Sequence, residues 1–273
     1  MPEKPEVITV TKKLEKRLLN KIITDCKVYY NNIIEYPSVD EFISKIKNQK
    51  MNSFTTRGKW IVIELDNDYL LAHLRMEGKF FYRDLNAPLE KHHHVVFTID
   101  NEFELHFQDV RKFARLKLIP KDKLYDMKPY NELGLEPWDK NLTSTYLKEK
   151  LKNKNLPIKT VLLDQSIITG IGNIYDDEIL FLSKINPLTK AKNINEDKLD
   201  LIIKNTVSVL DKAIAEGGTT IRNYTSEEGV TGLFQNNLLV HTKVGQPCPN
   251  CKETIVKIKV GGRGTYYCPK CQK

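Results

Sequence analysis

The sequence predicts an α+β protein of two domains, with a β-sandwich and flanking helices in its N-terminal part and a helical C-terminal part. Three observations support this prediction. Apolar and polar residues alternate through much of residues 21–119, the apolar spacing becomes helical after about residue 140, and two closely spaced cysteine pairs lie near the C terminus. Strands and helices in separate blocks are typical of α+β proteins rather than of parallel α/β proteins.

The chain begins with a predicted surface helix, and the start of this helix is chemically distinctive. Four apolar residues have helical spacing among lysines and arginines: Val7, Val10, Leu14 and Leu18. Before them, Pro2 follows Met1 and precedes Glu3. Removal of Met1 gives Pro2 a secondary amine with a reference pKa of about 8, and such amines attack aldehyde-like carbons to form iminium ions. The structural alternative is that Pro2 and Glu3 only begin the helix.

The following strands predict a sandwich or a barrel. Alternation is clearest in residues 60–65 and 102–107, where Ile, Leu and Phe occupy every second position. Between the early strands, Ser38 is expected to cap a short helix that places Phe42 and Ile46 on one side.

Residues 120–140 contain three prolines and a glycine with little periodicity, which is typical of a linker. A later helix is predicted to end at Gly217 and Gly218. Its predicted apolar face consists of Leu199, Ile203, Thr206, Leu210 and Ile214. Residues 217–237 are expected to form a long functional loop. The expected organisation is a sandwich domain with the first helix (1–119), a linker (120–140), a helical domain (141–240) and a cysteine-bearing finger (241–273).

Length and charge narrow the classes of function. The chain has 273 residues, of which 40% are hydrophobic, but no apolar run long enough to span a bilayer and no secretory signal pattern. A cytoplasmic protein is therefore expected. The formal charge of +8 favours a polyanionic partner, nucleic acid before a membrane, since neutralising phosphates releases counterions.

The cysteine pairs predict one structural zinc ion. Cys248 and Cys251 form one C-x-x-C pair, Cys268 and Cys271 form another, and sixteen residues separate the pairs. This is the spacing of a four-thiolate zinc ribbon, whereas the alternative of two disulfides would need an oxidising compartment. The remaining Cys26 is expected to be a buried, inert thiol. No organic cofactor is indicated.

Two further segments could contact phosphates. A glycine-framed turn, Gly261-Gly262-Arg263-Gly264, can present one arginine at a hairpin tip. Gly170-Ile171-Gly172 precedes a helix whose natural cap is Asn173, and free amides at a helix start bind anions. An exposed arginine and an ordinary capped helix are the structural alternatives.

An ordered set of motifs then resembles the formamidopyrimidine-DNA glycosylase family over essentially the whole chain. The motifs are MPEKPEV at the N terminus, Arg57-Gly58-Lys59, His73-Leu74-Arg75-Met76-Glu77-Gly78, Lys91-His92-His93-His94, Asp109-Val110-Arg111-Lys112-Phe113, Gly170 to Glu178, Gly217-Gly218-Thr219-Thr220 and the cysteine pairs. The resemblance implies a bacterial base-excision repair enzyme with a helix-two-turn-helix. It implies removal of 8-oxoguanine and ring-opened purines from double-stranded DNA, strand cleavage and action as a monomer at the nucleoid.

Residue roles follow from the same resemblance. It implies that Pro2 is the nucleophile at C1′, Glu3 the acid/base, and Lys59 and Arg263 further members of the catalytic set. Residues that fill the space of the flipped nucleotide or bind the DNA backbone are Met76, Arg111, Phe113, His73, His92, Asn173 and Lys257. Glu77, Thr219 and Thr220 are implied to cover the flipped base.

The chain departs from the family pattern at three places. Lys4 replaces a usual leucine, His93 a common aspartate, and His241-Thr242-Lys243 a usual Tyr-Gly-Arg. Lys4 adds a cation beside the proposed nucleophile, and His241 is expected to alter one phosphate contact. The three adjacent histidines do not predict a second metal site, because neighbours in a strand point to opposite faces.

Two alternatives remain beside the oxidised-purine glycosylase. An endonuclease VIII-like enzyme would excise oxidised pyrimidines, and a comparison of the excised bases separates the two activities. A non-catalytic zinc-ribbon protein would bind damaged DNA without cutting it, although Pro2, Glu3 and Lys59 argue against that reading.

Overall fold

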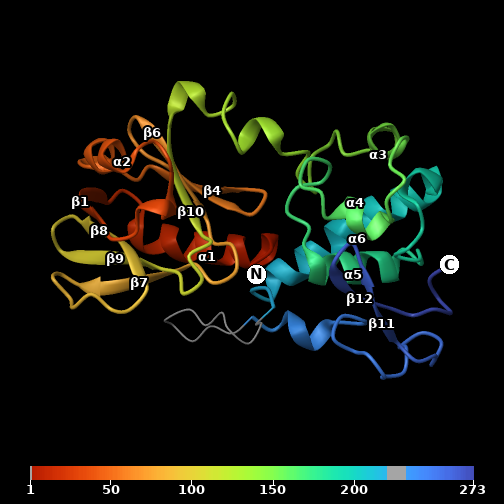
Figure 1. Cartoon of the computed structure of the whole chain (residues 1–273). Coiled ribbons are helices and arrows are strands. Elements are labelled where there is room, and N and C mark those ends of the chain that lie inside the picture. Colours follow the sequence, from red (N-terminus) through yellow and green to blue (C-terminus); the bar gives the residue numbers. More distant parts are fainter. Residues whose placement is uncertain (1, 220–231) are drawn as a thin grey trace. The chain divides into compact units, whose positions relative to one another are not determined.

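The computed structural model describes residues 2–219 and 232–273 and separates the chain into two compact units (Figure 1). Residues 2–131 form one unit, and residues 132–219 with 233–273 form the other. Among the helices of the described residues, none has the length and apolarity needed to cross a membrane.

The first unit is a β-sandwich with helices at its side. Its elements are α1 (Lys4–Leu18), β1 (Ile22–Val28), the 3₁₀ turn η1 (Asn31–Ile33), β2 (Ile34–Tyr36), α2 (Val39–Ile46), β3 (Gln49–Lys50), β4 (Ser53–Arg57), β5 (Trp60–Glu64), β6 (Asp68–His73), β7 (Lys79–Asp84), β8 (His93–Ile99), β9 (Phe103–Gln108), β10 (Arg115–Pro120), η2 (Lys121–Lys123) and η3 (Tyr130–Glu132). One sheet has the order β3-β1-β8-β9-β7 and the other β2-β10-β6-β5-β4.

The two sheets and α1 share one apolar core. Val95, Phe97 and Phe107 come from one sheet and Ile61 and Leu116 from the other, and all are at most 1% exposed. The apolar face of α1 completes this core. Strand β5 is buried on both faces, and the polar residues Glu104 and His106 of β9 are buried too.

Local signals predicted the start of the short helix and the end of the long one, but not the whole buried face of the long helix. The Ser38 hydroxyl accepts a hydrogen bond from the Glu41 amide at 3.4 Å and caps α2, as expected. Helix α6 (Glu196–Ala215) ends before Gly217 and Gly218, which both have positive φ. Its buried face differs from the predicted one, since Ile203 and Ile214 are only half-buried. The buried residues of α6 are Leu199, Ile202, Thr206, Val209, Leu210 and Ala213.

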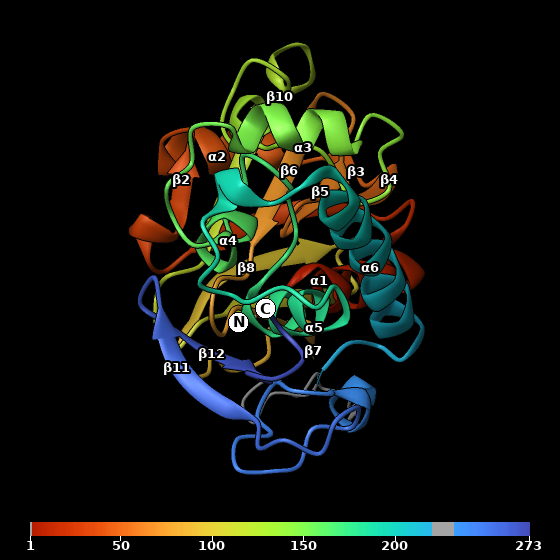
Figure 2. The same ribbon diagram turned by 90° about the vertical axis from the view of Figure 1, so that its right-hand side faces the viewer.

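The second unit is helical and ends in a two-stranded ribbon. Its elements are α3 (Ser144–Leu151), α4 (Ile158–Leu162), α5 (Asn173–Leu182), η4 (Ala191–Asn193), α6, η5 (Phe234–Asn237), β11 (Val256–Val260) and β12 (Arg263–Tyr267). Figure 2 shows β11 and β12 side by side, and their antiparallel register pairs Val260 with Arg263. Helices α4 and α5 form the helix-two-turn-helix region, in which the Gln165 side chain bonds to the backbone of Leu163, Gly170 and Ile171.

Helix α5 is buried almost completely, including its acidic residues. The Glu178 carboxylate accepts hydrogen bonds from the amides of Leu239, Val240 and His241 at 2.8, 3.0 and 2.8 Å. Burial raises the pKa of Glu178, while these three backbone bonds oppose the rise. One side chain of α5 therefore fixes the segment that leads into the ribbon.

We expect Glu178→Gln to lower the free energy of unfolding by about 3 kcal/mol, because the amide NH₂ would face a backbone N–H that needs an acceptor. Glu196→Gln is the matched control. Glu196 makes an exposed ion pair with Lys148, so that substitution should cost less than about 0.5 kcal/mol. Urea unfolding of the zinc-loaded protein measures both values, and equal losses in the two variants would contradict the assignment.

Candidate functional site

The first unit buries the start of α1. Pro2 precedes the helix, Glu3 is its N-cap residue, and both are buried. The Glu6 carboxylate accepts a hydrogen bond from the Glu3 amide at 2.8 Å. The helix begins at Lys4 with Pro5 in its first turn, so Pro2 lies before the helix rather than at its first helical position.

Lys4 is held against the neighbouring strand. Its ammonium donates to the Thr56 hydroxyl at 3.0 Å and to the Thr56 carbonyl at 3.5 Å, and the residue is only 3% exposed. The extra cation noted in the sequence therefore ties the start of α1 to β4. The same contact brings Glu3 and Pro2 to the end of the sheet at which β4 turns into β5.

Lys59 lies in that turn, next to His73. Arg57 pairs with Trp60 across the turn, Gly58 has a φ of +54°, and Lys59 is 7% exposed. His73 is the cross-strand partner of Trp60, and the two rings meet edge to face with centroids 4.9 Å apart. Register within one sheet thus places the two predicted residues together.

His73 is an uncharged hydrogen-bond donor. Burial, with the nearby charges of Arg75 and Lys59, lowers the pKa of His73 to about 3. Its Nδ1 accepts a hydrogen bond from the Arg75 amide at 3.0 Å. A neutral ring that accepts at Nδ1 carries its proton on Nε2, so this nitrogen can donate to an anion.

Two loops beside His73 expose the predicted wedge residues. Met76 is 36% and Phe113 49% exposed, so neither is the buried core residue that a sandwich could have made of it. Gly78 packs closely between them, because a Cβ there would lie 2.8 Å from the Leu74 carbonyl and 3.2 Å from the Ala114 side chain. Glu77 lies half-buried in the same turn as Met76.

The second loop is organised by the buried carboxylate of Asp109. It accepts hydrogen bonds from the amides of Arg111, Phe113 and Ala114 at 3.0, 2.7 and 2.7 Å. The Arg111 guanidinium lies 5.0 Å from the centre of the Phe113 ring. The backbone of this loop is therefore fixed while its two outer side chains stay at the surface.

His92 precedes β8 in a left-handed conformation with a φ of +68°. Its carbonyl accepts a hydrogen bond from the Asp109 amide at 3.1 Å, and His94 Nε2 lies 2.8 Å from the Asp109 carbonyl. His92, Arg111 and Phe113 are thus joined through Asp109. The motif was recognised in the sequence, but the central role of this aspartate was not.

The second unit brings three other predicted residues together at the ribbon. The Asn173 side chain donates to the Gly264 carbonyl at 3.0 Å, next to Arg263. Lys257 lies across the hairpin, where a Cβ on Gly264 would be 3.2 Å from Lys257 Cε. Asn173 was expected to cap α5, but Gly172 is the N-cap residue and Asn173 is the first residue of the helix. The Asn173 side chain bonds to the ribbon instead of capping α5.

The hairpin tip has little freedom. Gly261 and Gly262 have φ values of +53° and +79°, as the two-residue turn requires, and Arg263 follows at once in an exposed position. A Cβ on Gly261 would lie 2.5 Å from Thr160 Oγ1 of α4. The turn thus packs directly on the helix-two-turn-helix region and presents Arg263 beside Asn173.

Sequence reasoning missed a buried ionic network beneath this surface. The Lys159 ammonium, which is fully buried, donates to Asp177 Oδ1 at 2.7 Å, and the other Asp177 oxygen lies 2.6 Å from His241 Nδ1. His241 also packs edge to face on Tyr266 of the ribbon. Lysine and aspartate normally face solvent, and Asp177 lies between two other acidic residues, so the sequence did not indicate that it is buried.

Thr219 is buried and forms an isolated bridge with Leu233. Thr220 and residues up to 231 of the predicted loop lie outside the described residues. The proposed covering of a flipped base by this loop therefore stays a prediction.

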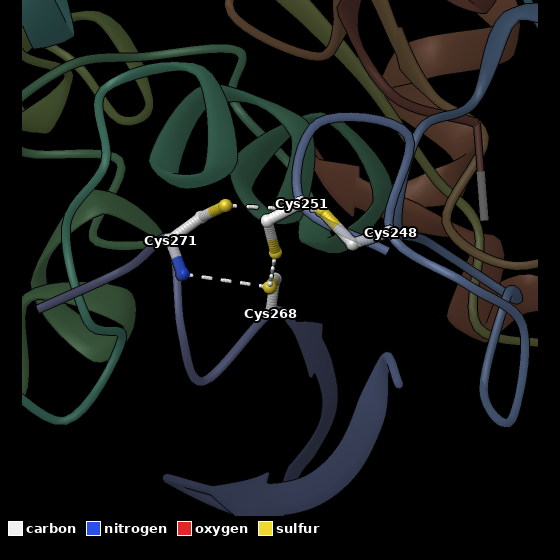
Figure 3. Close-up of side chains that lie close together, drawn as sticks. All are labelled: Cys248, Cys251, Cys268 and Cys271. Atoms are coloured by element: carbon white, nitrogen blue, oxygen red, sulfur yellow. Dashed lines mark hydrogen bonds between the residues drawn. The ribbon is translucent and has the colours of Figure 1, made fainter. Parts of the chain in front are cut away.

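The four predicted cysteines converge, as Figure 3 shows. Their sulfur atoms all lie within 4.8 Å of one another, and two of the pairs are 3.5 and 3.9 Å apart. Four thiolates about 2.3 Å from one zinc ion lie about 3.8 Å apart, so the geometry suits one structural zinc and excludes disulfides. Cys26 is buried, which raises its pKa to about 12 and makes it inert.

Three family models match successive parts of the chain. They are the formamidopyrimidine-DNA glycosylase N-terminal domain over residues 1–116, the H2TH domain of the same family over 133–225, and the zinc finger found in FPG and IleRS over 245–273. The last match agrees with the geometry of the cysteines.

Relatives and solved structures agree with these matches. The formamidopyrimidine-DNA glycosylase of Exiguobacterium sibiricum is 44% identical, and that of a Bacillus cereus strain 42%, each over 100% of this chain and 99% of the relative. A Lactococcus lactis FPG variant in complex with Fapy-dG-containing DNA superposes with a TM-score of 0.93 and 36% identity, covering both chains completely. The same bacterium's enzyme with abasic-site DNA gives a TM-score of 0.92. The chain belongs to the formamidopyrimidine-DNA glycosylase family.

Proposed function

We propose that this protein is a bifunctional glycosylase and abasic-site lyase that repairs oxidised purines in double-stranded DNA. The observation that carries the proposal is the burial of Pro2 and Glu3 at the start of α1, which Lys4 ties to β4 immediately before the turn that holds Lys59. Its relatives are named for this glycosylase activity, and similar solved chains hold DNA with Fapy-dG or an abasic site. The relatives are bacterial, and we expect a cytoplasmic monomer.

The proposed chemistry begins at the Pro2 amine after Met1 is removed. The nitrogen attacks C1′, the bond to the base breaks, and the base leaves with a proton. Glu3 assists opening of the sugar ring, which yields a Pro2 iminium ion. The iminium acidifies the C2′ proton, whose removal expels the 3′ phosphate. A second elimination expels the 5′ phosphate and leaves a one-nucleotide gap.

Access to C1′ requires the nucleotide to leave the base stack. Met76, Arg111 and Phe113 suit the space that it leaves, because they are exposed on two adjacent loops of one unit. A thioether and an aromatic ring can fill the gap, and a guanidinium can bond to the unpaired base. Glu77, Thr219 and Thr220 remain our candidates for covering the flipped base.

Phosphate binding is proposed for residues of both units. In the first, Lys59, His73 and His92 offer a cation and imidazole donors; in the second, Asn173, Lys257 and Arg263 cluster at the hairpin. The zinc ion would act only through the fold, since it holds the ribbon that presents Lys257 and Arg263. None of the proposed chemical steps passes through the metal.

Oxidised pyrimidines are a second candidate class of substrate, because one similar solved structure is Lactococcus lactis FPG with oxidised-pyrimidine-containing DNA at 36% identity. Parallel excision assays on 8-oxoguanine and an oxidised pyrimidine separate the two classes. A protein that binds both duplexes but cuts neither would be a non-catalytic damage-binding protein.

We expect borohydride to trap Met1-processed protein covalently on duplex DNA with 8-oxoguanine opposite cytosine, and Pro2→Gly to lower the yield of adduct about a hundredfold. Pro5→Ala is the matched control, because Pro5 lies in the first turn of α1 and should trap normally. Gel analysis of adduct and nicked strand gives the readout, with mass spectrometry to verify removal of Met1. Trapping that survives Pro2→Gly unchanged would exclude the proline nucleophile.

His73 and Lys257 should affect DNA binding in different ways, because one is a neutral donor and the other a cation. With a pKa of about 3, His73 does not change charge between pH 5 and 8. We expect His73→Ala to weaken binding of a duplex with a stable abasic analogue about fivefold without changing its salt dependence. Lys257→Gln should lower the slope of log Kd against log salt by about 0.9. Fluorescence anisotropy in a salt series measures both, and a smaller slope in His73→Ala would mean that His73 binds as a cation.

A further inference from the structure

A buried chain of three polar side chains lies on the face of the β7-β8-β9 sheet opposite the apolar core. Glu104 Oε2 lies 2.7 Å from His106 Nε2, and His106 Nδ1 lies 2.8 Å from His93 Nδ1. Glu104, His106 and His93 are 6%, 1% and 3% exposed. The Phe81 ring stacks on His93 with a centroid distance of 5.7 Å. Buried polar groups of this kind are costly unless they are paired, so their geometry constrains the strands that carry them.

The direction of the hydrogen bonds follows from the environment of His93 Nε2. This buried atom has no hydrogen-bond partner among the described residues, and a buried N–H without an acceptor is costly, so we assign it a lone pair and no proton. His93 then donates from Nδ1 to His106 Nδ1. A His106 ring that accepts at Nδ1 carries its proton on Nε2 and donates from there to Glu104.

A proton on His93 Nε2 would bury a charge and an N–H without an acceptor. Burial, reinforced by His106, lowers the pKa of His93 to about 4. The other charged or titratable groups that act on it are Glu90, Arg83 and His94, of which Glu90 opposes the shift. His93 is therefore neutral near pH 7 in the folded protein.

His93 is the middle residue of a segment whose neighbours both bond to Asp109. The His92 carbonyl accepts from the Asp109 amide, and the His94 ring contacts the Asp109 carbonyl. The ladder between β8 and β9 shifts register between His93 and Val95, so backbone pairing alone does not hold this point. The bond from His93 to His106 joins β8 to β9 at the irregularity.

We propose that His93 and His106 are positioning residues, which with Glu104 hold the start of β8 so that His92, Arg111 and Phe113 are presented to damaged DNA. The inference rests on the proposed function, since it assigns a task to the Asp109 loop. It also gives a role to His93, which stands where the family commonly has an aspartate. The expected defect is in DNA affinity, because none of the three residues touches the reacting atoms in the proposed chemistry.

The test compares two substitutions of His93. His93→Leu keeps an apolar volume but removes the donor to His106, and we expect about a tenfold higher Kd for an abasic-analogue duplex and a higher KM, with kcat unchanged. His93→Asn places an amide N–H near the position of Nδ1 and should restore Kd to within about twofold of the parent protein. Val96→Ala is the control for packing, because Val96 is a buried cross-strand neighbour of His106. It should lower stability without changing Kd.

The pH dependence of stability supplies a second readout. The folded pKa of about 4 lies below the usual 6.5, so the unfolded chain takes up the proton first. Stability contributed by His93 is present above pH 6.5 and is lost as the pH falls toward 4. His93→Asn should remove this part of the acid sensitivity. Nitrogen-15 spectra of the parent protein should also show His93 protonated on Nδ1 only, whether or not the leucine variant folds.

The possible outcomes separate the two proposals. If the parent protein neither binds nor cuts a damaged duplex, the proposed function fails. If it does both, and His93→Leu binds as the parent does or Val96→Ala weakens binding equally, only the positioning role fails. A proton on His93 Nε2 in the nitrogen-15 spectra would overturn the directed chain of hydrogen bonds.

Discussion

The second unit depends on the burial of charge in α5. A carboxylate removed from water must be paired or bonded to backbone amides, because an uncompensated buried charge costs several kcal/mol. Glu178 meets this requirement with the amides of residues 239–241, and Asp177 meets it with Lys159 of α4 and His241. The hydrogen bonds and the ion pair that these two carboxylates of α5 require therefore fix α4 and the segment that leads into the ribbon. The zinc cysteines then complete a module whose attachment is already set.

The first unit meets a similar requirement at the carboxylate of Asp109. Asp109 binds three amides of its own loop, and its backbone bonds to the segment around His92. Such a loop can expose large side chains at little entropic cost, because its backbone is already ordered. In the proposed function, Arg111 and Phe113 would enter the DNA from a loop whose backbone is ordered before binding.

Periodicity and local motifs predicted the elements whose causes are local. The Ser38 cap, the glycines that end α6, the Gly261-Gly262 turn and the cysteine pairs each act within a few residues, and all were confirmed. Alternation also predicted a sandwich. The failures involve partners distant in sequence. Asn173 does not cap α5 but bonds to Gly264, and the sequence did not indicate that Glu104 and His106 are buried.

For the candidate site, the resemblance selected the residues but could not show their supports. Lys59 and His73 come together only through strand register, and Lys4 reaches Thr56 across the gap between helix and sheet. The sequence near Asp177 does not indicate that its carboxylate pairs with Lys159 and His241, which lie 18 and 64 residues away. Pairing over such separations depends on the assembled fold and is not visible in a single sequence.

The close packing of Gly261 against Thr160 limits the length of the hairpin. The turn already touches α4, so a longer or bulkier tip would have to lift the whole ribbon away from the helix. Adding one residue would also exchange the two faces of the following strand, since side chains alternate along it. Arg263 would then point away from the side on which it now lies. The position of Arg263 therefore depends on the number of residues in the hairpin. A substitution at residue 263 leaves its backbone in place, whereas an insertion before it would move the side chain to the other face.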